Sequence, residues 1–266
     1  AELPLFTLCE ILGVAESDRP KLIEWMHYLE RASDTMRKGE EIDPAFFGAF
    51  VQNVLEMFDF GKHVLQARRR DPKEDLLSAI ANAEIDGSKL SDEMLDGSWL
   101  LIVFAGNDTT RNSLSGTMKL LTEFPEQKQM LLKDTSLISN MTHEAIRMVS
   151  PVIYMRRTAT EDAEIRGQKI AEGEKVVMYY GAANRDPDVF PHPDRMDVTR
   201  VNAKDHIAFG MGPHVCLGQR VANMQLEAAY RQILARFPNA EWTGDIDITP
   251  NNFVHAIARL SVDLGI

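Results

Sequence analysis

The sequence contains little cysteine and no long apolar stretch. Only Cys9 and Cys216 occur among its 266 residues, so at most one disulfide can form and no metal cage of several cysteines can be built. The longest apolar block, residues 99–105, is far shorter than the roughly 20 residues that a membrane-spanning helix needs. The first residues, AELPLFTLCEILG, lack the basic region and the long apolar segment of a signal peptide. We therefore predict a cytoplasmic protein without a membrane span.

Basic residues are also in the minority. The 29 lysines and arginines are outnumbered by 40 acidic residues, and the net charge of -11 disfavours non-specific attraction to nucleic acid or anionic lipid. We therefore expect no nucleic-acid partner. The densest basic run, residues 68–70, is better explained as a favourable charge cluster at the C-terminus of a helix than as a docking site.

Helical periodicity dominates the first half of the chain, which opens in the middle of a helical pattern. Ser91 is the predicted N-cap of an unusually long helix that runs to Pro125. Pro151 disfavours helix in the residue before it and so ends the last helix of this half. The predicted helices cover residues 20–36, 44–70, 91–125, 126–133 and 136–149.

The second half changes character. Short β-like runs separated by Gly167 and Gly173 predict small sheets within residues 152–180. Residues 184–213 are rich in Pro, Asp and Gly and indicate a long irregular meander, which is uncommon in a compact domain unless it is functional. A last helix over residues 217–237 and a β-like tail follow. The predicted fold class is mainly α with small β-sheets, in one domain with a helix-rich part (1–150), sheets and meander (151–215), and helix and tail (216–266).

The most informative segment is F-G-M-G-P-H-V-C-L-G at residues 209–218. Cys216 follows a glycine-rich loop and precedes the predicted last helix, where free backbone N–H groups and the helix dipole are expected to lower the pKa of its thiol. A single thiolate suits one bond to a soft metal such as haem iron, because haem supplies the in-plane ligands itself. The spacing alone fits an inert, buried cysteine equally well.

The segment resembles the cysteine-ligand loop of the cytochrome P450 superfamily, whose pattern F-G-x-G-x-H-x-C-x-G it matches at every defined position. Two further motifs occur in the family's order, A-G-x-D-T-T at residues 105–110 and E-x-x-R at residues 144–147. Three motifs in order are specific, and the resemblance extends over the whole chain. It implies a cytochrome P450 fold, Cys216 as axial ligand to the iron of haem b, and a monooxygenase that uses O2 as co-substrate.

The resemblance also implies roles near the haem. It places Thr109 and Asp108 in catalysis, with Thr109 taking part in oxygen activation and Asp108 connecting it to solvent protons, on a helix that is locally opened. The local sequence fits a solvated turn of a surface helix as the alternative. His214 and Arg157 match the contacts of the haem propionates, with Arg156 as an alternative to Arg157. The implied cofactor-binding residues are Ala105, Arg157, Phe209, Gly210, His214, Cys216 and Gly218.

Two more groups of residues have a structural or substrate-binding interpretation. Glu144 and Arg147 share one face of a helix, and without context such a pair is a surface ion pair of little energetic value. The resemblance implies a buried structural pair, completed by Arg200, that locks the meander. An apolar substrate pocket and an ordinary core explain a further set of side chains equally well: Leu101, Phe104, Ile153, Met155, Phe253 and Val254.

The segments AGNDTTRNS and SPVIYMRRTAT are similar to those of bacterial cytochromes P450 that hydroxylate alkanes, fatty acids, terpenoids and sterol side chains. This similarity implies a hydrophobic small-molecule substrate, and electrons delivered from NAD(P)H through a ferredoxin reductase and a ferredoxin. Family members are longer, so we expect this chain to lack their N-terminal helices. Two alternatives stay open: a haem-binding fragment or sensor without turnover, and a helical protein with no cofactor.

Overall fold

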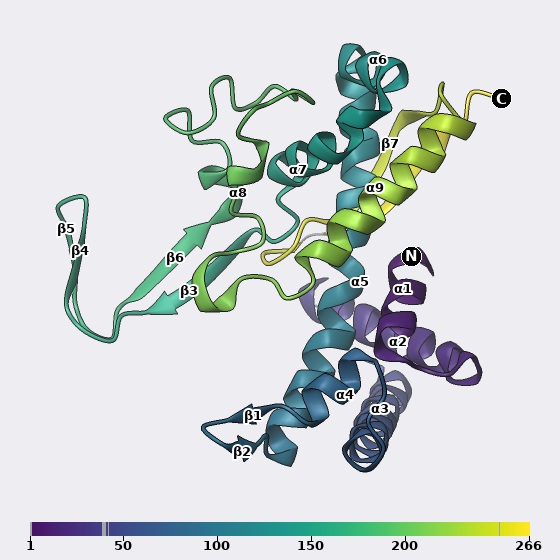
Figure 1. The fold of residues 1–266 in the computed structure, drawn as a ribbon, viewed down its shortest axis with the longest axis vertical. Helices are drawn as coiled ribbons and strands as arrows, with labels where there is room; N and C mark the ends of the chain where they lie inside the picture. Colours follow the sequence, from purple (N-terminus) through teal and green to yellow (C-terminus); the bar gives the residue numbers. More distant parts are fainter. Residues whose placement is uncertain (1, 39–40, 42, 250) are drawn as a thin grey trace. The chain divides into compact units, whose positions relative to one another are not determined.

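The computed structural model describes residues 2–38, 41, 43–249 and 251–266, and Figure 1 shows their helices and strands. The chain forms two compact units, residues 1–108 and residues 109–266. Helices predominate in both, and the strands pair two by two in antiparallel ladders. This confirms the predicted mainly α class with small sheets. Among the described helices, none is both long enough and apolar enough to cross a membrane.

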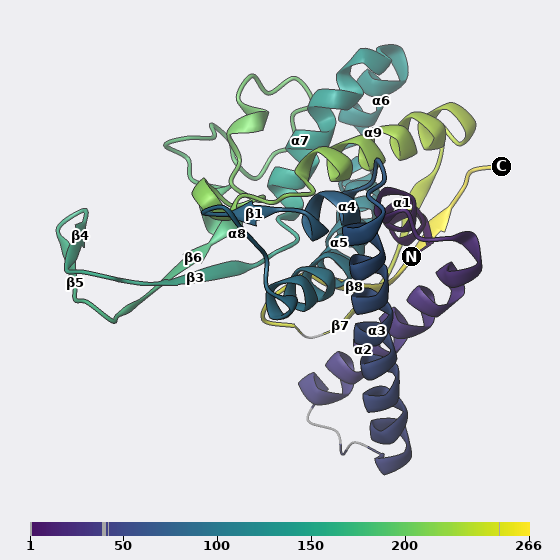
Figure 2. The ribbon, with the colours of Figure 1, turned by 60° about the horizontal axis from the view of Figure 1, so that its bottom comes forward.

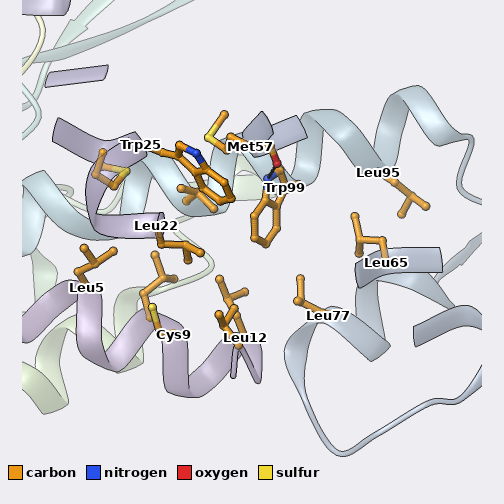
Figure 3. Packing of buried hydrophobic residues seen from close by; sticks show 14 of the residues in the cluster. Leu5, Cys9, Leu12, Leu22, Trp25, Met57, Leu65, Leu77, Leu95 and Trp99 are labelled. Carbon is orange, nitrogen blue, oxygen red and sulfur yellow. Dashed lines mark hydrogen bonds between the residues drawn. The ribbon is translucent and has the colours of Figure 1, made fainter. Parts of the chain in front are cut away.

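The first unit is built on helices around two tryptophans. Trp25 and Trp99 are almost completely buried and lie in one apolar cluster with Leu12, Met57 and other side chains (Figure 3). The indole Nε1 of Trp99 donates to the carbonyl of Met57 at 3.0 Å. A Cβ atom at Gly61 would lie 2.4 Å from the Trp99 ring, so only glycine fits there. The elements of this unit are α1 (Glu2–Leu12), α2 (Arg19–Lys38), α3 (Pro44–Arg70), α4 (Leu76–Ala81), β1 (Glu84–Ile85), β2 (Ser88–Lys89) and the start of α5.

The basic run at the end of α3 has a structural role. Nε of Arg68 donates to the Asp75 carboxylate at 2.6 Å, and Nε of Arg69 donates to the Ala81 carbonyl at 3.0 Å. These bonds join the end of α3 to α4. The interpretation of residues 68–70 as a charge cluster at a helix C-terminus agrees with this geometry. Helix α4 and the β1–β2 hairpin were not predicted, because they are too short to show sequence periodicity.

Helix α5 (Asp92–Glu123) begins in the first unit and ends in the second. The hydroxyl of Ser91 accepts from the Met94 amide at 3.3 Å, which confirms the predicted N-cap. The helix is continuous, so the predicted local opening is wrong. Within it, the hydroxyls of Ser113 and Thr117 donate to carbonyls four residues earlier, at 2.8 and 2.7 Å. Such bonds let polar side chains remain inside a helix without breaking it.

Three further helices carry the second unit: α6 (Pro125–Lys133), α7 (Ile138–Val149) and α9 (Gln219–Arg236), with a 3-10 turn (Thr135–Leu137) before α7. Helices α7 and α9 lie side by side in both views (Figures 1 and 2). The Tyr230 hydroxyl on α9 donates to the Leu114 carbonyl of α5 at 2.7 Å. A Cβ atom at Gly116 would lie 2.6 Å from the Val149 side chain, so this glycine lets α5 approach α7 closely.

The strands form hairpins at the predicted positions. Strand β3 (Tyr154–Thr158) pairs with β6 (Lys175–Tyr179), and β4 (Ala163–Ile165) pairs with β5 (Gln168–Ile170) at the tip of the same hairpin (Figure 2). Strand β7 (Glu241–Thr249) pairs with β8 (Ala256–Asp263) in the tail. The short helix α8 (Tyr180–Ala183) follows β6, and the meander after it contains 3-10 turns at Ala203–Asp205 and Gly212–His214.

Candidate functional site

The loop before α9 places a cysteine at the surface. Residues 211–218 are all exposed, and Cys216 stands at their end, two residues before Gly218, the N-cap of α9. The amide of Cys216 donates to the Phe209 carbonyl at 2.8 Å, and the amide of Gly210 donates to the Ile207 carbonyl at 2.8 Å. Two backbone bonds therefore fix where the Cys216 thiol emerges.

Glycine is required at one position of this loop by two independent constraints. Gly210 has φ +74°, and a Cβ atom there would lie 3.2 Å from the Tyr180 hydroxyl and 3.4 Å from the His214 carbonyl. Gly212 also has positive φ, +68°, but its Cβ position is open. Gly218 has φ -85°, and a Cβ atom there would make only ordinary contact with the sulfur of Cys216, at 3.9 Å. The chain's own packing therefore requires Gly210, and does not require Gly218.

The predicted lowering of the Cys216 pKa is wrong. Desolvation raises the pKa of this thiol above its usual value, because loop atoms crowd the sulfur although the residue as a whole is exposed. The backbone amides of Gly218 and Gln219 act in the opposite direction and stabilise the thiolate. The helix N-terminus therefore supplies the expected donors, but their effect is smaller than that of desolvation.

The surroundings of Cys216 fit a flat apolar group that contains a metal. Met211, Val215 and Leu217 expose 71%, 43% and 76% of their surface in the same loop. Among the described residues, no three His, Cys, Asp or Glu side chains are grouped so that they could hold a metal ion. A lone sulfur beside apolar side chains therefore suits a metal that brings its remaining ligands with it, as haem iron does.

The two predicted propionate contacts lie in different elements. His214 is exposed and belongs to the Cys216 loop itself. Arg157 is exposed on β3, where its Nη1 donates to the Arg156 carbonyl at 3.0 Å. Arg156 and Arg157 are the two candidates for the second propionate contact. Because adjacent residues of a strand point to opposite faces, their side chains have opposite orientations. The hairpin therefore presents one guanidinium on each of its faces.

Phe209 links the loop to the helices of the second unit. Its half-buried side chain packs against a buried cluster of Ala208, Ile146 of α7 and Leu226 of α9, and Leu114 of α5 packs against the same cluster. The loop that carries Cys216 is thus anchored on three helices. One of them, α5, also carries Thr109, five residues before Leu114.

The predicted catalytic residues lie on α5 at the boundary of the two units. Asp108 is the last residue of the first unit and Thr109 the first of the second, and both are half-buried. The neighbouring Asn112 is completely buried, and its Oδ1 accepts from the Ile257 amide at 2.8 Å. Ala105, which belongs to the same motif, is exposed. The burial of Asn112 could not be predicted, because helical periodicity does not distinguish a buried asparagine from an exposed one.

The predicted substrate residues are distributed over both units. Leu101 and Phe104 are exposed on α5 in the first unit, by 64% and 40%. The others belong to the second unit, where Ile153 and Met155 are half-buried, Phe253 is exposed and Val254 is buried in a bridge with Val152. A pocket that is shared by all six residues remains a prediction.

Glu144, Arg147 and Arg200 form a buried charged network. Glu144 and Arg147 have no exposed surface, and two guanidinium nitrogens of Arg147 donate to the two carboxylate oxygens at 2.8 Å each. Nε of Arg200 donates to the same carboxylate at 3.0 Å. The remaining donors of both arginines meet carbonyls of the meander: Asn184, Pro191, His192, Pro193 and Arg195. One carboxylate thus organises two guanidinium groups and the chain around them.

Sequence reasoning assigned no role to two other buried groups of this region. His206 is 9% exposed, its ring lies 5.7 Å from that of His143, and its pKa is lowered to about 4 by desolvation and by the nearby His143 and Arg147. Asn184 is completely buried and joins three segments of the chain. Both residues come from the irregular meander, where periodicity gives no information on burial.

Comparison with known proteins gives a consistent picture. The cytochrome P450 family model matches residues 45–258. Linalool 8-monooxygenase of Pseudomonas putida is 38% identical over 99% of this chain and 63% of its own length, and steroid C26-monooxygenase of Mycobacterium tuberculosis H37Rv is 33% identical over 98% and 65%. The structure of a Mycobacterium marinum cytochrome P450 in complex with pseudoionone matches 97% of this chain and 62% of its own, with a TM-score of 0.85 and 37% identity. The chain spans less than two thirds of the length of these three proteins.

Proposed function

Since the chain belongs to the cytochrome P450 family, we propose that it binds haem through Cys216 and acts as a monooxygenase on hydrophobic small molecules. The observation that carries this proposal is the exposed residue Cys216, which backbone hydrogen bonds hold in a loop among exposed apolar side chains. When bound, haem supplies the activation of O2 and the insertion of one oxygen atom into a C–H bond. The protein would bind the haem, orient the substrate and exclude water from the reaction.

The roles of the loop residues follow from their positions. Cys216 would hold the haem iron through its sulfur, and the amides of Gly218 and Gln219 stabilise the thiolate form. Gly210 allows the left-handed turn of the loop beside Tyr180, because a Cβ atom there would lie 3.2 Å from the Tyr180 hydroxyl. His214 and one of the β3 arginines supply donors for the two propionates.

Helix α5 carries the two residues, Asp108 and Thr109, that would deliver protons in the proposed reaction. Asp108 and Thr109 are consecutive half-buried residues of α5, and the positions on either side of them are buried. A half-buried carboxylate and a half-buried hydroxyl are both suited to pass protons between solvent and a reacting group. We expect Thr109→Val to keep oxidising NAD(P)H while it forms less product. The measurement is the amount of product formed per NAD(P)H consumed.

The substrate class proposed is an aliphatic or isoprenoid molecule such as a terpenoid, a fatty acid or a steroid side chain. Two observations support it: the apolar side chains Leu101, Phe104, Met155 and Phe253, and relatives named for linalool, methyl-branched lipids and steroids. Electrons would arrive from NAD(P)H through a ferredoxin and its reductase. Titration of the haem-loaded protein with linalool, a branched fatty acid and a steroid, read as a shift of the haem Soret band, compares the classes.

The carbon-monoxide complex of the reduced protein tests the haem site directly. We expect the red-shifted Soret band of a thiolate-ligated haem, and its complete loss in Cys216→Ser. Cys9→Ser is the matched control, because Cys9 is buried in the first unit and should leave the band in place. Absence of the band in the wild type would contradict the proposal.

A further inference from the structure

We infer that Asn184 is a positioning residue that couples the Glu144–Arg147 pair to the Cys216 loop. The inference rests on the proposed function, in which Cys216 is the ligand of haem iron. Asn184 is completely buried at the end of α8, and its side-chain amide joins two segments that are far apart in the sequence. The juxtaposition of Ser150, Asn184 and Ile207 carries the argument.

The first link is to the end of α7. Nδ2 of Asn184 donates to the hydroxyl of Ser150 at 2.8 Å, and that hydroxyl donates to the Arg147 carbonyl at 2.8 Å. Ser150 is the C-cap of α7 and has φ +43°, a left-handed backbone conformation that residues other than glycine rarely adopt. The buried hydroxyl and the cap geometry together define where the amide of Asn184 lies.

The second link is to the loop. Oδ1 of Asn184 accepts from the Ile207 amide at 2.8 Å, and the Ile207 carbonyl accepts from Gly210 at 2.8 Å in the turn that leads to Phe209. The Phe209 carbonyl in turn accepts from the amide of Cys216. Three consecutive hydrogen bonds therefore connect the Asn184 side chain with the backbone of the proposed iron ligand.

The third link is to the charged pair. Nη1 of Arg147 donates to the backbone carbonyl of Asn184 at 2.7 Å, while Arg147 itself is held by Glu144. Asn184 is thus fixed through its backbone by Arg147 and fixes Ile207 through its side chain. The amide group supplies both a donor for Ser150 and an acceptor for Ile207, whereas Leu at this position leaves the buried Ile207 amide without its acceptor.

The test compares Asn184→Leu with Asn140→Leu in the haem-loaded protein. Asn140 is the control: it is half-buried, and its Nδ2 donates to the meander carbonyls of Val198 and Arg200 at 2.9 and 3.1 Å, but its side chain makes no bond to Ile207. The readout is the ratio of thiolate-ligated to thiolate-free haem in the reduced carbon-monoxide complex, measured from the Soret bands at equal haem content. A purely structural role lowers haem content in both variants and leaves this ratio unchanged.

We expect the ratio to fall by roughly tenfold in Asn184→Leu, the factor that corresponds to one lost buried hydrogen bond, and to stay near the wild-type value in Asn140→Leu. Ser150→Ala removes the acceptor of the Asn184 amide and the donor to the Arg147 carbonyl but leaves the bond to Ile207 in place, so it should shift the ratio in the same direction by a smaller factor. Equal ratios in Asn184→Leu and Asn140→Leu overturn the inference. If Asn184→Leu does not fold, an unchanged ratio in Ser150→Ala overturns it. A wild type without the thiolate band contradicts the proposed function instead.

Discussion

The Glu144 network and the Cys216 loop lie in the same unit of the molecule and are built in opposite ways. In the network, a carboxylate and two guanidinium groups are buried and their donors end on carboxylate or carbonyl oxygens. In the loop, a thiol and three apolar side chains are exposed. Polar groups inside and apolar groups outside reverse the usual arrangement. The difference indicates that the network serves folding, whereas the loop leaves its apolar surface for a bound group.

The largest effect expected from this contrast is on the network. Glu144→Gln leaves Arg147 and Arg200 buried without a compensating charge, so the free energy of unfolding should fall by about 3–5 kcal/mol. Urea unfolding followed by circular dichroism measures it. Glu227→Gln is the control, because Glu227 pairs with Arg231 on the surface of α9 and its loss should cost less than about 1 kcal/mol. Similar losses in the two variants would break the comparison.

The second prediction concerns acid sensitivity beside the network. Folding lowers the pKa of His206 from 6.5 to about 4, since desolvation, His143 and Arg147 all disfavour its protonated form. The folded protein therefore binds fewer protons than the unfolded chain between these values. Stability from this group is complete above pH 6.5 and is lost as pH falls towards 4, by at most about 3 kcal/mol.

His206→Gln removes this dependence. The neighbours that set it are His143, which itself lies near Lys204 and Glu227, and the paired Arg147. Unfolding free energies measured from pH 7 to pH 4 should fall less steeply in His206→Gln than in the wild type. A wild-type slope in His206→Gln would show that another group controls the acid response.

The contrast between network and loop also explains what could be predicted from the sequence. Long helices follow from periodicity and caps, and Ser91 and the start of α5 agree with the structure. The three motifs identified the loop and the charged pair because their residue types and order are specific. The pKa of Cys216 could not be predicted from the loop pattern, since it depends on how closely loop atoms crowd the sulfur, which only the folded chain determines.

The contacts of the meander with segments distant in the sequence could not be predicted. Asn184 and His206 stand in an irregular segment, where no periodicity separates buried from exposed positions. Their partners, Ser150 and His143, belong to α7, which lies tens of residues earlier in the chain. The continuous course of α5 was mispredicted for a related reason, because side-chain hydroxyls can bond to carbonyls of their own helix.

A third prediction sharpens the comparison within the loop. Gly210→Ala combines left-handed backbone strain with the close Tyr180 hydroxyl and should lower the free energy of unfolding by about 2–3 kcal/mol. Gly212→Ala carries the strain without a close neighbour and should cost about 1–2 kcal/mol. Urea unfolding of both variants separates the two contributions. Equal costs would show that Tyr180 moves aside and that packing does not restrict the loop.

The smallest effect is expected at the centre of the proposed site. Cys216 is exposed, so Cys216→Ser should change the free energy of unfolding of the haem-free protein by less than about 0.5 kcal/mol, although it abolishes the thiolate band of the haem-loaded protein. Cys9→Ser is the opposite case, because it places a hydroxyl in the apolar core of the first unit and should cost about 1–3 kcal/mol. Urea unfolding of the two variants gives both values. If Cys216→Ser costs as much as Cys9→Ser, the sulfur contributes to the fold itself, and the division between a folding network and a binding loop fails.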